Sequence, residues 1–296
     1  MRVLILGSRG QDGHYLTEHC KARGDEVLGL SRTTHPLACD VGDLAQVESA
    51  VRSFAPDQVY LLAARSSTRE GLYAEHQRTI VEGTRHLLST IEQLRPQARV
   101  FVAGSALQFE NHGAPIDETT LFAASSSYAL ARIMATWTAR YFRSRGLAVR
   151  VGFLFHHESP LRPAAHIAQH VATVARRIAA GSRERLALGA PEVAREWTFA
   201  GDVARAMTRG LEQDHEDEVV IGSGEAHTLG EWAASCFLAC GLDWREHTDV
   251  LSGYTPEYEK LVSNPSRLLG LGWRKAVELE ELAHRMVSSG LSPAFA

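Results

Sequence analysis

The sequence predicts an α/β fold, in which helices cover both faces of a doubly wound parallel sheet of the Rossmann type. Apolar runs that fit strands alternate with segments of helical periodicity from residue 2 to residue 155. The strand runs are apolar almost throughout, which is typical of parallel strands buried on both faces. A glycine-rich turn, GSRGQDG at residues 7–13, joins the first strand run to the first helical segment. Because crossovers between parallel strands are right-handed, these observations together indicate a doubly wound sheet.

The expected elements end where the alternation breaks down, after residue 156. Beyond that point helices mix with short strands such as EVVIG at 218–222. We therefore expect a Rossmann domain over residues 1–156 and a smaller mixed α/β substrate lobe over residues 157–296, with some chain exchange between the two. Strands are expected at 2–7, 26–31, 36–40, 58–64, 98–105 and 148–155, and helices at 15–24, 43–54, 79–94 and 126–146.

The composition argues against several classes of protein. With 296 residues and a formal net charge of −4, the chain has no basic excess that would favour nucleic acid. It has no N-terminal signal pattern, and no apolar run approaches the ~20 residues needed to span a bilayer. The four cysteines contain no CxxC pair, and the spacing of Cys236 and Cys240 favours packing over a metal site. We expect a cytoplasmic protein with no metal, nucleic-acid or membrane partner.

The glycines at positions 7, 10 and 13 predict a nucleotide site. They follow a GxxGxxG pattern between a strand and a helix, where glycine allows a tight turn and a close approach of the backbone to a diphosphate. The helix N-terminus that follows would point at the same diphosphate.

The end of the second strand predicts which dinucleotide is bound. An acidic residue there would accept hydrogen bonds from the ribose 2′-hydroxyl of NAD, whereas this chain has GLSRTT, with Arg32 and hydroxyl side chains that suit a 2′-phosphate. The alternative is that Arg32 is a solvated surface residue. Asp40 and Val41 fall where an adenine edge would lie, and Leu62, Ala63 and Ala64 would let the chain approach the cofactor closely.

A tyrosine and an arginine lie four positions apart in SSSYALAR, residues 125–132. On a helix this spacing puts Tyr128 and Arg132 on one face. A guanidinium beside a phenol favours the phenolate and so tunes the phenol as a proton donor or acceptor. The two residues either form a chemical site or are only neighbours on a helix, and this stretch alone does not distinguish the two.

Five segments together resemble the extended short-chain dehydrogenase/reductases, and among them the GDP-mannose 4,6-dehydratase family. The resemblance runs from about residue 3 to about residue 288. In the second segment, His156 stands where the family has asparagine. The segments are GSRGQDGHYL (7–16), FLFHHESP (153–160), GAPEVAREW (189–197), GSGEAHTLGEWA (222–233) and NPSRLLGLGW (264–273).

The resemblance implies a site for NADP and a nucleotide-activated sugar. Tyr128 would be the acid/base at the sugar 4-hydroxyl, Arg132 takes the place of the family's lysine, and Ser105 would complete the hydrogen bonds to the reacting oxygen. Substrate contacts would come from Glu158 and from Arg195, the latter on the diphosphate. The alternatives are that His157 is a core histidine and that Arg195 pairs with Glu192 or Asp202. The residues expected at the cofactor are Gly7, Gly10, Gln11, Asp12, Gly13, Arg32, Asp40, Val41, Leu62, Ala63, Ala64, Ser66, His157 and Arg162.

The chain also departs from the family pattern. The family's Thr-Ser-Glu is replaced by Gly104, Ser105 and Ala106, and alanine cannot remove the sugar C5 proton that elimination of water requires. We therefore expect a 4-keto reductase or an epimerase acting at C4 of a nucleotide-activated, GDP-type sugar. The alternatives are a GDP-mannose-type dehydratase and a non-catalytic relative that binds NADP or a nucleotide-sugar.

Assembly is expected to differ as well. Only TTHPLA separates Arg32 from Cys39, where the family has a long loop that braces a neighbouring subunit. A dehydratase-type tetramer is therefore not expected, whereas a homodimer through the two long helices around 79–94 and 126–145 is.

Overall fold

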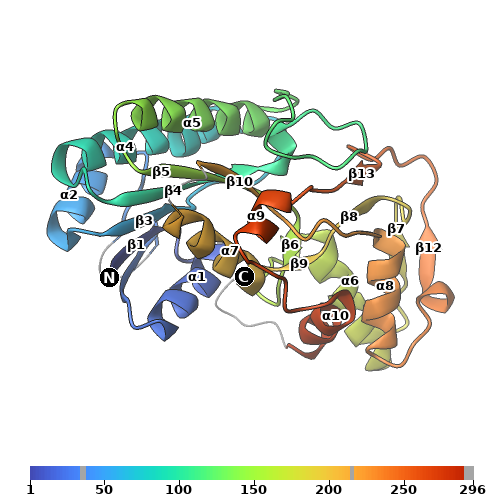
Figure 1. The fold of residues 1–296 in the computed structure, drawn as a ribbon. Helices are drawn as coiled ribbons and strands as arrows, with labels where there is room; N and C mark the ends of the chain where they lie inside the picture. Colours follow the sequence, from blue (N-terminus) through green and yellow to red (C-terminus); the bar gives the residue numbers. More distant parts are fainter. Residues whose placement is uncertain (34–37, 214–216, 290–296) are drawn as a thin grey trace.

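A six-stranded parallel sheet forms the centre of the molecule (Figure 1). This is a computed structural model, and it describes residues 1–33, 38–213 and 217–289. Neighbouring strands of the sheet run parallel throughout, in the order β10-β5-β4-β3-β1-β2, which confirms the predicted fold class. The strands are β1 (Arg2–Leu6), β2 (Glu26–Leu30), β3 (Gln58–Leu61), β4 (Arg99–Ser105), β5 (Val149–Leu154) and β10 (Glu218–Ile221).

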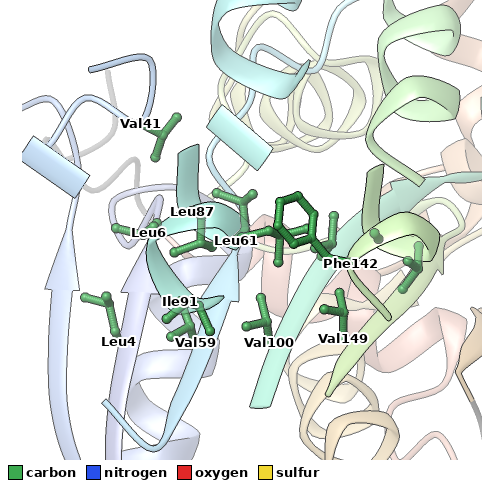
Figure 2. Close-up of a cluster of buried hydrophobic side chains, with 14 of the residues drawn as sticks. Leu4, Leu6, Val41, Val59, Leu61, Leu87, Ile91, Val100, Phe142 and Val149 are labelled. Atoms are coloured by element: carbon green, nitrogen blue, oxygen red, sulfur yellow. The ribbon is translucent and has the colours of Figure 1, made fainter. Parts of the chain in front are cut away.

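Helices cover both faces of this sheet because successive side chains of each strand point to opposite sides. On one face, Leu4 and Leu6 of β1 belong to a core with side chains of α2, α4 and α5, and Figure 2 shows Leu87 and Ile91 among them. On the other face, Val3 and Ile5 pack with α1 and α7. The helices are α1 (Gln11–Ala22), α2 (Leu44–Phe54), α4 (Gly83–Leu94), α5 (Ser127–Ser144) and α7 (Ala200–Glu212).

The strand predicted at 36–40 is wrong where the structure describes it. Residues 38–40 form no strand, and residues 36 and 37 lie outside the described part of the chain. Cys39 donates one backbone hydrogen bond to Ser31 O, at 2.9 Å, which is not a ladder. Cys39, and Val41 just after it, are instead buried in the core with side chains of α2 and α4, and this burial accounts for apolar residues here without a strand. Burial without pairing therefore produced a strand-like pattern.

The long helix predicted at 79–94 begins earlier, at residue 73, and consists of three helical pieces of which the last two cover the predicted range. A short helix, α3 (Tyr73–His76), continues into a π-helix (Gln77–Glu82) and then into α4. At the join, a Cβ on Gly83 would lie 2.8 Å from a methyl carbon of Val41, so glycine lets this helix pack closely on the chain below. π-turns are rare and often lie at functional sites. This one places His76 beside the candidate site.

The second half of the chain builds a smaller lobe around its own core. Trp197, Trp232 and Phe237 are central to it, and the two tryptophan rings stack with centroids 4.7 Å apart. β10 and α7 come after residue 157 yet lie with the large sheet, and the division at residues 156 and 157 stays a prediction. The remaining helices are α6 (Ile167–Ala179), α8 (Leu229–Leu238), α9 (Ser266–Gly270) and α10 (Leu279–Ser288); the short strands are β6 (His157–Glu158), β7 (Leu186–Leu188), β8 (Ala194–Glu196), β9 (Thr198–Phe199), β11 (Ala226–Thr228), β12 (Thr248–Val250) and β13 (Lys260–Leu261).

Two properties of the described residues bear on the expected partners. None of the helices in this part of the chain is both long and apolar enough to cross a bilayer. No group of three or more His, Cys, Asp or Glu side chains within the described ranges is arranged to hold a metal ion.

Candidate active site

The glycine turn between β1 and α1 has the geometry that a diphosphate site needs. Gly7 has a φ of +100°, and a Cβ there would lie 2.7 Å from Ala63 N. A Cβ on Gly13 would collide with the carbonyl oxygen of Gly7. Gly10 is exposed and caps α1 without any side-chain hydrogen bond to the first turn, so the N–H groups of that turn are available to an anion. The turn therefore fits a nucleotide diphosphate.

Asp12 and His157 form a charged pair beside this turn, although 145 positions separate them in the chain. His157 Nε2 lies 2.8 Å from Asp12 Oδ1, and His157 Nδ1 lies 2.7 Å from the carbonyl oxygen of Phe155. Both ring nitrogens face acceptors, so the ring is placed to carry both protons. Burial opposes charge on both groups, but their mutual attraction outweighs it. The pKa of His157 is accordingly raised, and that of Asp12 falls to about 2.

Further hydrogen bonds fix the loop after β5 against the start of α1. Ser159 Oγ donates to Gln11 Oε1 at 2.7 Å. Arg162 donates from Nε to Glu158 at 2.9 Å and from Nη2 to the carbonyl oxygen of His157 at 3.1 Å. The fold thus brings Gln11 and Asp12 together with His157 and Arg162, and the resemblance had assigned these four residues to one cofactor site. The alternative of a core histidine stays open, because His157 is buried and both of its ring nitrogens have partners within the protein.

The residues predicted at the adenosine end lie near the ends of β2 and β3. Arg32 is exposed, and its guanidinium is 3.8 Å from Glu75. Asp40 pairs with Arg78 at 2.9 Å, and Val41 is buried. Leu62 and Ala63 line the close approach to Gly7, Ala64 follows them, and Ser66 is exposed. The contacts of these residues with a cofactor stay predictions.

Tyr128 and Arg132 form a buried pair at the other end of the site. Ser126 caps α5 by accepting from Ala129 N at 3.1 Å, which starts the helix so that Tyr128 lies in its first turn. Arg132 Nε donates to the Tyr128 hydroxyl oxygen at 3.1 Å, and its Nη1 donates to the carbonyl oxygen of Ala103 in β4. Tyr128 is 6% exposed and Arg132 is 7% exposed. They are therefore more than neighbours on a helix, since the arginine ties the phenol to the end of the sheet.

Ser105 is the last residue of β4, and Ala106 directly follows it. Ser105 Oγ accepts from Leu107 N at 3.2 Å, which leaves its hydroxyl proton available to an oxygen in the site. Ala106 is buried and brings no titratable group. Glu110 and His112, the acidic and basic groups nearest in sequence, lie on an exposed loop 3.8 Å from each other. Neither side chain is buried with Tyr128.

His76 is a candidate that sequence reasoning missed. It is fully buried, its Nδ1 lies 3.0 Å from Ser127 Oγ, and its ring meets the Tyr128 ring edge-on with centroids 5.6 Å apart. Its position depends on the π-helix that follows it, and no local pattern in the sequence signals that helix. Only a structure could have placed this histidine against Tyr128.

Arg195 projects from the middle strand of the three-stranded sheet β11-β8-β13. Its guanidinium carbon lies 5.7 Å from the Trp197 ring centroid and 5.6 Å from that of Tyr258. The expected alternative partner Asp202 binds Arg205 instead, at 2.7 Å. The next residue along, Glu196, points the other way and accepts from Ser223, Gly224 and Ser263, which locks the strand in place.

Fold and site together define an extended short-chain dehydrogenase/reductase: a Rossmann sheet, a glycine turn at the first helix, and a helix-borne tyrosine with a basic partner four residues on. The sequence profile of the family described as GDP-mannose 4,6 dehydratase matches residues 4–286. The chain belongs to this family.

Known relatives agree with this assignment over the whole length. GDP-mannose 4,6 dehydratase 1 of Arabidopsis thaliana is 31% identical over 98% of this chain and 89% of its own length. GDP-mannose 4,6-dehydratase of Yersinia enterocolitica is 26% identical over 99% and 94%. Among solved structures, UDP-glucose 4-epimerase of Thermus thermophilus in complex with NAD superimposes with a TM-score of 0.84 at 25% identity, over 97% of this chain and 98% of that one. RMD from Pseudomonas aeruginosa complexed with NADPH has the same fold, with a TM-score of 0.84 at 19% identity over 97% of this chain and 96% of that one.

Proposed function

We propose that this protein is an NADP-dependent oxidoreductase that acts at C4 of a nucleotide-activated sugar of the GDP type, as a 4-keto-sugar reductase or as an epimerase. The observation that carries the proposal is the composition of the catalytic end. Tyr128 and Ser105 offer an exchangeable proton and a hydrogen bond, whereas the buried Ala106 has no group that could take a proton from carbon. The tyrosine and serine that hydride chemistry at C4 needs are therefore present, whereas the base that elimination of water needs is absent from position 106.

The residues at the glycine turn support a nicotinamide dinucleotide. Gly7 and Gly13 fit a backbone approached closely by a diphosphate, and the relatives of known structure include complexes with NAD and with NADPH. Arg32, which lies past the end of β2 with no acidic residue at that position, supports the 2′-phosphate of NADP. When bound, the nicotinamide would supply the hydride in reduction, or accept it in the oxidative half of an epimerase.

The chain's own residues would handle the proton. In reduction, the Tyr128 hydroxyl gives its proton to the sugar O4 as the carbonyl becomes an alcohol, and the phenolate that remains is reprotonated from solvent. Arg132, with Nε on the phenolic oxygen, stabilises the negative charge that this leaves. Ser105 donates to the same O4 and orients it.

A screen of 4-keto nucleotide-sugars with NADPH, followed at the nicotinamide absorbance, tests the proposal. We expect oxidation of NADPH with at least one 4-keto substrate, and a hydroxyl at C4 in the product. The proposed activity is wrong if the cofactor binds but the protein neither reduces any 4-keto nucleotide-sugar nor epimerises any nucleotide-sugar at its C4 hydroxyl.

A second candidate is a non-catalytic relative that binds NADP or a nucleotide-sugar as a sensor or a partner subunit. One observation favours it: the Arg132 guanidinium is held by Ala103 O as well as by Tyr128, so part of its donor set is used inside the protein. Absence of turnover both in the native protein and after Arg132→Lys, with binding retained, would select this candidate.

The expected homodimer through α4 and α5 is supported by their outer surface. Trp137 and Tyr141 are 58% and 57% exposed on α5 and border a groove of about 510 Å³ with Arg85 and Ser89. Exposed aromatic side chains of this kind are typical of an interface core. In light scattering we expect a dimer that Trp137→Glu converts to a monomer and that Leu238→Glu, a 73% exposed leucine on α8, leaves intact. A monomeric native protein would refute this interface. The cysteines of the described residues are free, and we propose a cytoplasmic location for the protein.

A further inference from the structure

His156 stands between a cation and an anion that do not reach each other. Its Nε2 lies 3.3 Å from Arg195 Nη1 and 3.6 Å from Glu158 Oε1. One ring nitrogen cannot accept from the guanidinium and donate to the carboxylate in the same protonation state. His156 Nε2 can therefore form a hydrogen bond with either Arg195 or Glu158, but not with both at once.

Two buried polar atoms beside this histidine lack hydrogen-bond partners among the described residues: Arg195 Nε and Glu158 Oε1. Glu158 is 1% exposed, and its other oxygen binds Arg162. Such unpaired buried atoms are costly, and a ligand that gave both a partner would remove that cost. Arg195 has no carboxylate partner among the described residues, which points to an anion as that ligand.

The groups around His156 set its protonation in the free protein. Burial lowers the pKa of His156 well below its usual value, and Arg195 and Arg162 lower it further. His157, in the neighbouring position of β6, and His166, which precedes α6, act in the same direction, whereas Glu158 is the carboxylate that faces the ring. His156 is therefore neutral, and its Nε2 accepts a hydrogen bond from Arg195 Nη1.

We propose that His156 couples the binding of a diphosphate to the uptake of a proton. An anionic diphosphate oxygen takes the Arg195 donors, Nε included, and so releases His156 Nε2. With the guanidinium charge neutralised, Nε2 takes one proton from solvent and donates it in a hydrogen bond to Glu158 Oε1. Each of the three groups then has a partner: the arginine on phosphate, the imidazolium on the carboxylate, and the second oxygen of that carboxylate still on Arg162.

The coupling also gives the substrate pocket a preference for the charged diphosphate. A sugar without its nucleotide diphosphate would leave Arg195 on His156 and both unpaired atoms as they are. This inference rests on the proposed function, because it takes the ligand to be a nucleotide-sugar. A family-type asparagine at position 156 would bind the same ligand with no proton uptake.

Titration calorimetry with GDP-mannose, in the presence of saturating NADP, tests the coupling. Each phosphate of this ligand carries one ester and one anhydride bond and keeps only a strongly acidic hydroxyl, so the ligand itself neither takes up nor releases a proton near neutral pH. Binding is measured in buffers of small and of large ionisation enthalpy, and the dependence of the observed heat on the buffer gives the number of protons taken up. We expect an uptake approaching one proton per ligand below neutral pH, which falls as the pH rises.

Two variants separate His156 from its neighbours. His156→Asn should bind GDP-mannose with proton uptake reduced to near zero, whereas His166→Asn, a matched histidine that does not touch Arg195, should keep the uptake. His157 already carries its proton on Asp12 and contributes none. Binding without proton uptake, or equal uptake in native protein and His156→Asn, would overturn the inference alone. If neither GDP-mannose nor UDP-glucose nor dTDP-glucose bound at all, the nucleotide-sugar proposal would be wrong, and the inference with it.

Discussion

The two ends of the candidate site differ in how they are built. At the dinucleotide end, Asp12 meets His157 at 2.8 Å and Gln11 meets Ser159 at 2.7 Å, so each polar group has a partner from a distant part of the chain. At the catalytic end, the phenol of Tyr128 is paired with an arginine held on β4, and the position after Ser105 is a buried alanine. A protein can therefore keep the binding half of a site intact while the half that does chemistry changes, because the two halves are held by separate contacts.

The largest effect is expected from Tyr128→Phe, which removes the exchangeable proton and little else. Turnover should fall by ~10³-fold or more, since positioned proton transfer contributes about 10²–10⁴-fold. Cofactor affinity should not change, and this result would show that the dinucleotide end of the site works independently of the catalytic end. Tyr141→Phe, on the exposed side of the same helix, is the matched control. Undiminished turnover in Tyr128→Phe would remove this tyrosine from the chemistry.

Arg132→Lys is expected to come next, with a fall in turnover of ~10²-fold, the range seen when one well-placed donor at a reacting oxygen is lost. An ammonium cannot replace the two directed donors that reach Tyr128 Oη and Ala103 O. Arg140 also lies on α5 but pairs with Glu218 of β10, so Arg140→Lys should leave the rate unchanged. A faster enzyme after Arg132→Lys would show that the arginine is not the working partner of Tyr128.

The charged pair at the dinucleotide end predicts a pH dependence of stability. The pKa of Asp12 is lowered in the folded state, so its contribution is present above its unfolded value of 3.8 and is lost as the pH falls through about 2. The pKa of His157 is raised, so its contribution is full below 6.5 and is lost as the pH rises through its folded value. Together the two groups contribute about 1–2 kcal/mol to the free energy of unfolding, allowing for the partial exposure of Asp12. This contribution is greatest between about pH 4 and pH 6.5.

Urea unfolding of native protein, Asp12→Asn, His157→Asn and the double variant measures this pair energy directly. The coupling energy should be larger near about pH 5 than near about pH 8. A coupling that is equal at both values would show that the pair is not charged as the geometry implies.

The smallest effect is expected from Arg32→Ala, because the side chain is exposed and screened by solvent. The preference for NADPH over NADH should drop ~10-fold in Arg32→Ala, about the contribution of one exposed charge-assisted contact. The control Arg52→Ala, on α2, should leave this preference unchanged. Equal affinity of the native protein for both cofactors, or an unchanged preference in Arg32→Ala, would refute the role of Arg32.

Much of this site follows from local sequence. The glycine turn works through the first few residues of one helix, so its geometry is visible in GSRGQDG, and the Tyr128–Arg132 pair follows from helical spacing. The Asp12–His157 pair could be expected only through the family resemblance, because nothing local links residues so far apart. The strand expected at 36–40 failed because burial of a residue such as Cys39 gives the same apolar pattern as strand pairing does.

Other features depend on packing that no sequence pattern reports. The π-helix places His76 against Tyr128, and the side-chain pattern of Gln77–Glu82 looks like that of any amphipathic helix. The alternative to a diphosphate role for Arg195 was pairing with a carboxylate, whereas the fold gives Asp202 to Arg205 and leaves Arg195 on a histidine. Which of several possible partners a charge takes is decided by strand and helix placement, not by the residues near it in sequence.

The central claim is that the catalytic end performs hydride chemistry at C4 without elimination. Incubation of the purified protein with GDP-mannose and NADP, followed by mass spectrometry of the nucleotide-sugar, tests it most directly. Ala106→Glu, assayed alongside, shows whether a carboxylate at that position restores elimination. The account predicts no 4-keto-6-deoxy product from the native protein, and accumulation of that product would contradict it.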